Sequence, residues 1–170
     1  MSVRGGVIYA IYNAEVTLTY SHITSTSMSA NSSSGGGRVL GGVIYTAGQA
    51  PLRTTITLTG AHITSTTGSG GIVKGGVINV GGPTALTLTN SRITNTSFGR
   101  LAPSDGSAHQ VEGGAIYVDE SQYDVDDRWP KDAVVVTLNN SHIANTSGAT
   151  DGGAIYVLDT GTAAGIVTMS

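Results

Sequence analysis

The chain has 170 residues, enough for one domain with a sizeable core, and 39% of them are hydrophobic. Only 11% are charged and Gly supplies 25 residues, a composition that excludes a charged disordered tail and long amphipathic helices. A net charge of −3 argues against nucleic-acid binding, and the lack of Cys excludes disulfides, thiol catalysis and Cys-ligated zinc.

No run of residues is long and apolar enough for a transmembrane helix, so we expect no membrane insertion. Met1 leads into a Gly-rich motif, and the basic and apolar regions of a secretory signal are missing at this point. If the protein is exported, we therefore expect its secretory signal to be missing from this sequence.

Internal repetition is the dominant feature of the chain. A motif of Gly-Gly, a small residue, Ile and Tyr or Asn recurs every 34 to 39 residues, starting at Gly5, Gly41, Gly75, Gly113 and Gly152. A second phrase of the EVTLTYS type follows from Glu15, Thr55, Ala85 and Val135. A third phrase, of the HITSTS type, starts at His22, His62, Arg92 and His142. The fifth copy stops inside its second phrase.

Each phrase alternates apolar and polar residues over about five positions, the pattern of a strand with one buried face. Three short strands per repeat, stacked on the equivalent strands of the next repeat, predict an all-β solenoid, a single-stranded parallel β-helix of about five rungs. We expect one domain over residues 1–170, with loop insertions at 28–40, 98–112 and 119–132 and shorter loops at 68–74 and 148–151.

The alternation assigns the inward residues. Three apolar ladders should form the core: Ile8, Ile44, Ile78, Ile116 and Ile155; Leu18, Leu58, Leu88, Leu138 and Met169; and Ile23, Ile63, Ile93 and Ile143. The next inward position of the third strand is expected to hold Ser25, Ser65, Asn95 and Asn145, where stacked Asn and Ser side chains hydrogen-bond along the solenoid. The Gly-Gly pairs should occupy sharp turns.

From Gly5 to Ser170 the repeats resemble those of right-handed parallel β-helix surface proteins, which include autotransporter passengers and polymorphic outer membrane proteins. Their GGA[I/L/V] motif matches at Gly113–Ile116 and Gly152–Ile155, while Ile stands where their FxxN motif has Phe. The resemblance implies a right-handed helix and a secreted or surface-displayed structural or adhesive module without a cofactor.

Outward Thr residues form regular rows. The second strand presents Thr17, Thr57, Thr87 and Thr137, followed by Thr168, and the third presents Thr24, Thr64 and Thr94 and, one position on, Thr26, Thr66, Thr96 and Thr146. Such hydroxyl and methyl lattices suggest an ice-binding protein as one alternative function. The competing interpretation is that Thr suits the solvated face of a strand.

A second outward row contains Tyr9, Tyr45, Asn79, Tyr117 and Tyr156. An exposed Tyr stripe predicts contact with a partner such as a glycan or a host surface, or with the insertion loops of the chain itself. A carbohydrate-binding or carbohydrate-active protein is the other alternative function. The row of His22, His62, Arg92 and His142 is better explained by exposed imidazoles than by a metal site, because it contains an Arg and no carboxylate.

No strand supplies paired carboxylates or a nucleophile with a base, so we expect no enzyme activity. The acidic insertion contains Asp124, Asp126 and Asp127, which are candidates for a Ca²⁺ site, although a solvated loop is the simpler interpretation. No other cofactor or metal is expected.

Neither end of the repeat array has a visible cap. We therefore expect either head-to-tail pairing with further copies into a filament, or membership of a longer β-helix. The sequence predicts a non-enzymatic extracellular or cell-surface structural or adhesive module.

Overall fold

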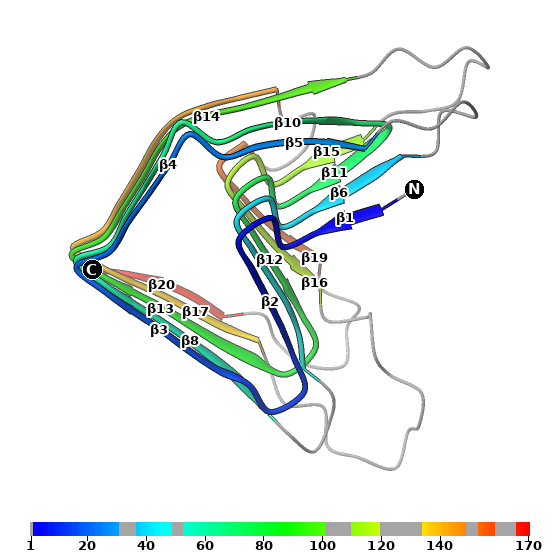
Figure 1. Cartoon of the computed structure of the whole chain (residues 1–170). Helices are drawn as coiled ribbons and strands as arrows, with labels where there is room; N and C mark the ends of the chain where they lie inside the picture. Colours follow the sequence, from blue (N-terminus) through cyan, green and yellow to red (C-terminus); the bar gives the residue numbers. More distant parts are fainter. Residues whose placement is uncertain are drawn as a thin grey trace.

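The computed structural model describes residues 2–30, 37–48, 53–100, 110–119, 134–148, 153–158 and 166–170. All regular secondary structure in these residues is β-strand, and all strand pairs within the sheets are parallel. The predicted all-β class with parallel sheets is therefore confirmed (Figure 1).

The strands form four sheets, which we call A to D. Sheet A contains β1 (Ser2–Arg4), β6 (Arg38–Leu40), β11 (Ile72–Lys74) and β15 (Gln110–Glu112). Sheet B contains β2 (Ile8–Ile11), β7 (Ile44–Ala47), β12 (Ile78–Gly81), β16 (Ile116–Asp119) and β19 (Ile155–Leu158). Sheet C contains β3 (Glu15–Thr19), β8 (Thr54–Thr59), β13 (Thr84–Thr89), β17 (Val135–Asn139) and β20 (Ile166–Met169). Sheet D contains β4 (His22–Thr24), β5 (Ser27–Ala30), β9 (His62–Thr64), β10 (Thr67–Gly70), β14 (Arg92–Arg100) and β18 (His142–Ser147).

The chain visits the sheets in the order A, B, C, D, and each such passage adds the next parallel strand to a sheet. Within a sheet the Gly-Gly, second and third phrases pair in register, for example Ile78 with Ile44 and with Ile116. In Figure 1 the strands of each sheet lie one behind another, and sheets A and B meet at an angle.

The sequence predicted three strands per repeat. The structure adds the strands of sheet A and, in sheet D, the strands β5 and β10 and the end of β14. The predicted loop 68–74 is strand β10 followed by β11, and the predicted loop 28–40 contains the end of β5 and all of β6. The predicted loop 98–112 likewise contains the end of β14 and all of β15. Strands β6, β11 and β15 of sheet A each have three residues with one buried Val at the centre, and three residues are too few for alternation to reveal a strand.

The three predicted ladders form the core. Their central members, among them Ile78, Leu88 and Ile93, are fully buried, and the members in the first and last passages are partly buried against them. Met169 lies on the edge strand β20 and is 74% exposed. The inward assignment of the apolar residues is confirmed, and the burial of each ladder depends on the passages above and below it.

The assignment of the Ser and Asn row was wrong. Ser65 and Asn95 are exposed with φ of +56°, and the Thr that follows each, Thr66 or Thr96, points inward at 0% and 1% exposure. A left-handed residue bends sheet D and shifts the alternation by one position, so the predicted outward Thr row at this position is an inward row. Asn145 does donate a hydrogen bond from Nδ2 to Asn95 Oδ1, 3.0 Å away, as the stacked-amide prediction requires.

The Gly-Gly pairs make the corner between sheets A and B. Gly75 has φ of +55°, which L side chains rarely adopt, and a Cβ there would also collide with the carbonyl of Ile78. A Cβ on Gly76 would overlap the ring of Phe98, which packs from sheet D onto this corner. The pair is therefore required both by the backbone turn and by the core.

Candidate functional site

Sheet C carries the predicted outward Thr row. Thr17 pairs with Thr57, Thr57 with Thr87, Thr87 with Thr137 and Thr137 with Thr168, in one register across five strands. Each of these residues is exposed or half-buried, and its neighbours in the interior strands are buried. The structure thus brings the row together on one face. In sheet D, Thr24, Thr64 and Thr94 are likewise paired in register and at least partly exposed.

The Tyr row lies outside the main core but is not the exposed stripe that alternation predicted. Tyr9 is 50% exposed, whereas Tyr45 and Tyr117 are 1% and 0% exposed. Tyr45 packs with Leu40 of sheet A in a separate apolar cluster. Sheets A and B meet at an angle (Figure 1), and residues on the outer face of sheet B contact side chains of sheet A, as Tyr45 contacts Leu40 and Tyr117 contacts Lys74. The predicted exposure of Tyr45 and Tyr117 is therefore wrong.

Two stacked ring pairs hold this row. The Tyr9 and Tyr45 ring centroids are 5.3 Å apart, and those of Tyr117 and Tyr156 are 5.5 Å apart, with nearly parallel planes. Asn79 stands between the two pairs, in register with Tyr45 and Tyr117.

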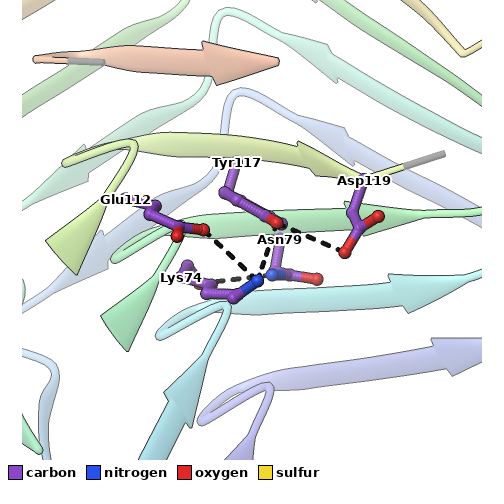
Figure 2. Close-up of polar contacts among 5 residues, drawn as sticks. All are labelled: Lys74, Asn79, Glu112, Tyr117 and Asp119. Carbon is purple, nitrogen blue, oxygen red and sulfur yellow. Dashed lines mark hydrogen bonds and ion pairs between the residues drawn. The ribbon is translucent and has the colours of Figure 1, made fainter. Parts of the chain in front are cut away.

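A polar cluster surrounds Asn79 and Tyr117 (Figure 2), and Lys74 Nζ lies 4.7 Å from the centroid of the Tyr117 ring. Lys74 Nζ lies 3.2 Å from Glu112 Oε2, and it donates a 2.8 Å hydrogen bond to the Tyr117 hydroxyl. The Tyr117 hydroxyl donates in turn to Asp119 Oδ2 at 3.2 Å. Lys74 and Glu112 belong to sheet A, and Tyr117 and Asp119 belong to sheet B, so the cluster joins the two sheets.

Burial is the first cause that raises the pKa of Tyr117, and the charges of Asp119 and Glu112 raise it further. The phenol therefore stays protonated at neutral pH, accepting from Lys74 and donating to Asp119. Such an arrangement suits the joining of two sheets better than proton transfer to a substrate.

The sequence analysis missed this cluster. The signal that could have found it is the residue before each Gly-Gly pair, Arg4, Leu40, Lys74 and Glu112, which forms one row in sheet A and places Lys74 beside Glu112. Asp119 was assigned to the acidic insertion, but it ends strand β16 and is 3% exposed. Asn79 Oδ1 is buried and, among the described residues, has no hydrogen-bond partner, while its Nδ2 donates to the Lys74 carbonyl.

The His and Arg row lies at the corner between sheets C and D, next to a polar groove of about 610 Å³. Arg92 pairs with His62 on one side and with His142 on the other, and the rings of His22 and His62 are 4.9 Å apart. The groove is lined by His62, Asn90, Ser91, Arg92, Asn140, Ser141, His142 and Ser170. Within the described part of the chain, no group of three or more His, Asp or Glu side chains could hold a metal ion.

The acidic candidates Asp124, Asp126 and Asp127 lie outside the described residues. The described residues contain no helix that is long and apolar enough to cross a membrane. Comparisons of the chain with protein-family models, with curated proteins and with solved structures found no match.

Proposed function

We propose that the chain forms a single-stranded right-handed parallel β-helix and acts as a non-enzymatic structural or adhesive module outside the cell or on its surface, assembling end to end with further copies. The repeated order of sheets A to D supports the β-helix. The right hand follows because connections between parallel strands of one sheet almost always have it.

The observation that carries end-to-end assembly is the exposure of apolar row members at the two end strands. Val7 and Tyr9 in the first passage are 52% and 50% exposed, whereas Val43 and Tyr45 in the second are buried. Met169 on β20 is 74% exposed, whereas Leu138, its partner on β17, is 6% exposed. A further passage stacked on either end would bury these side chains and pair the free strand edges.

A second copy fits because the rows continue across the junction. With β20 of one copy against β3 of the next, Thr168 would face Thr17 and Met169 would face Leu18, extending the Thr row and the apolar ladder. With β19 against β2, Tyr156 would stack on Tyr9 as Tyr117 stacks on Tyr156 within one chain. The contact is head-to-tail and so propagates into a filament.

Engineered disulfides test this register, because the chain has no Cys of its own. Equivalent residues on neighbouring strands lie about 4.8 Å apart, within disulfide range, so T17C/T168C should form a ladder of covalent multimers on mild oxidation. The matched control is T17C/T137C, whose outward Thr residues belong to the same row but would be separated by β20 at the junction. Equal cross-linking of the two variants would refute the register.

Filament formation is tested separately by negative-stain electron microscopy and sedimentation velocity over a range of concentrations. Uniform filaments, or a concentration-dependent increase in mass, are expected. A monomer at all concentrations would refute end-to-end assembly. Surface labelling of the cells that make the protein tests the proposed location, which a purely internal pool would contradict.

The in-register Thr row of sheet C favours ice binding as a second candidate function. Five outward Thr side chains along one face give a regular array of hydroxyl and methyl groups. If this array binds ice, Thr57→Tyr and Thr87→Tyr abolish inhibition of ice recrystallisation. Absence of inhibition by the unaltered protein removes this candidate.

A further inference from the structure

The corner between sheets C and D combines, within the described residues, an exposed aromatic ring, two exposed amides and a cation without a partner along one line. Three rows run past this corner. The first is Tyr20, Gly60, Asn90 and Asn140, all with positive φ; the second is Ser21, Ala61, Ser91 and Ser141; and the third is His22, His62, Arg92 and His142. In Figure 1 this is the vertex at which the C-terminal label lies.

The Ser row stabilises the backbone of the corner through hydrogen bonds. Ser91 Oγ donates toward the carbonyls of Leu58 and Thr89, each 3.0 Å away, and accepts from the Ala61 N–H. Ser141 Oγ donates to the Asn139 carbonyl and accepts from the Ser91 N–H. These bonds fix the backbone of the corner and leave recognition to the two outer rows.

The outer rows present unused hydrogen-bond donors. Asn140 Nδ2 donates to Asn90 Oδ1 at 2.7 Å, which turns the Asn90 amide nitrogen away from this bond. Within the described part of the chain, the Arg92 guanidinium is exposed and has no hydrogen-bond or ion-pair partner. His142 is exposed and His62 is half-buried, one on each side of Arg92. No side chain that lines the groove carries a carboxylate, although the chain end at Ser170, whose carbonyl accepts from the Asn140 N–H, also lines it.

An aromatic platform adjoins these donors. Tyr20 is 77% exposed, and its ring lies over Gly60, where an added Cβ would come within 2.6 Å of the ring. Gly60 lies two residues before His62 and next to Asn90 of the neighbouring strand, and both of these residues line the groove. The Tyr20 ring over Gly60 therefore lies beside the groove. An exposed Tyr ring offers an apolar face with a polar edge.

We infer that this corner binds an acidic oligosaccharide, with one sugar ring stacked on Tyr20 and an anionic group of the sugar chain held by Arg92 between His62 and His142. A flat apolar ring face suits the C–H face of a sugar, the amides suit its hydroxyls, and the guanidinium fork suits a carboxylate or a sulfate. The groove spans strands β9, β14 and β18, so an elongated chain fits it better than a single small anion.

A saccharide fits better than a nucleic acid or another polyanion. The chain carries a net charge of −3, so it provides no long-range attraction for a densely charged polymer. Recognition therefore depends on local contacts, with an aromatic platform and amides that a phosphate chain would leave unused. The inference rests on the adhesive role in the proposed function and names its ligand class, while end-to-end assembly is independent of it.

Calorimetric titration of the intact chain with a hexuronate oligosaccharide tests the inference. A sulfated oligosaccharide and a methyl-esterified, neutral one of the same length distinguish the anionic group from the sugar, and inorganic polyphosphate distinguishes a saccharide from a simple polyanion. Saturable binding of at least one acidic oligosaccharide is expected, at least about tenfold tighter than that of the neutral one.

Two variants and a matched control locate the site. Arg92→Gln and Tyr20→Ala should each weaken binding by about tenfold or more, whereas Tyr12→Ala, which removes another exposed Tyr (53%) at a different corner, should leave binding unchanged. Both test residues are exposed, so thermal unfolding should show intact folding. No binding of either acidic oligosaccharide, equal binding by Tyr20→Ala and the unaltered chain, or equal affinity for polyphosphate would overturn the inference. Because this readout does not depend on multimer formation, its failure is distinct from a failure of end-to-end assembly.

Discussion

Replacing Lys74 by Met tests whether the polar cluster joins sheets A and B. The side chains of Lys74 and Glu112 are 17% and 10% exposed, so the substitution leaves a largely buried carboxylate without its cation. It also removes the 2.8 Å hydrogen bond to Tyr117. Breaking a buried pair by removing one partner costs about 3–5 kcal/mol, and the remaining exposure of this pair places the loss of unfolding free energy at about 3 kcal/mol.

The partner substitution, Glu112→Gln, and the double variant complete a cycle. Glu112→Gln alone should lose about 2 kcal/mol, because Lys74 then loses the carboxylate that lies 3.2 Å from its Nζ. In the double variant both charges of the Lys74–Glu112 pair are removed together, so the combined loss should be smaller than the sum by about 2 kcal/mol.

Urea unfolding measures these differences. With a slope of about 2 kcal/mol per molar, Lys74→Met should lower the midpoint by about 1.5 M. Arg38→Met, at an exposed position of sheet A, is the control and should change the unfolding free energy by less than about 0.5 kcal/mol. Strictly additive losses in the cycle would show that Lys74 does not act through Glu112 and would refute the reasoning.

Three further substitutions test the fold. Tyr117 has a raised pKa in the folded chain, so its contribution to stability is present below the ordinary tyrosine pKa of about 10 and is lost as pH rises above it. In urea unfolding over a pH series, Tyr117→Phe should reduce the fall of unfolding free energy above that pH, and an unchanged fall would contradict this. Asn95→Ala should lose about 1–2 kcal/mol of unfolding free energy in urea, because it removes the side-chain hydrogen bond from Asn145 and places Ala at a positive φ. Asn95→Gly also removes the hydrogen bond but tolerates the positive φ, so it should lose less; equal losses would contradict the role of φ. Ile78→Ala should cost about 3–4 kcal/mol and Ile8→Ala markedly less, since Ile8 lies in the first passage; equal costs would show that neighbouring passages do not determine burial.

Much of the fold could be predicted because its signal is local and repeated. The positions of Ile78 and Leu88 hold an apolar residue in every repeat, and a period of two residues places these positions on the buried face wherever the strand is straight. The prediction failed where one backbone angle changes the alternation. The φ of Asn95 is positive, so Thr96 turns inward, and no alternation pattern reports that angle.

The exposure of the outer face could not be predicted for a different reason. Alternation places Tyr117 outside the main core, which is correct, but it carries no information on the angle between sheets. That angle brings Lys74 of sheet A against Tyr117 and buries the ring. Asp119 was missed for the same reason. It ends β16 within the angle between sheets A and B, but in the sequence it is the first residue of an acidic segment.

The two candidate sites share one property, which is a departure from the identity of a stacked row. In a repeating chain each row places equivalent side chains at one spacing, so a single unlike residue creates a local environment that its neighbours lack. Asn79 interrupts the Tyr row, and Lys74 takes the vacated space against Tyr117, bringing its ammonium group to Glu112. Arg92 interrupts the His row in the same way and provides the groove with a cation that has no partner in the described part of the chain. Restoring either row, by Asn79→Tyr or Arg92→His, should therefore remove the local chemistry while the repeat pattern that specifies the strands stays intact.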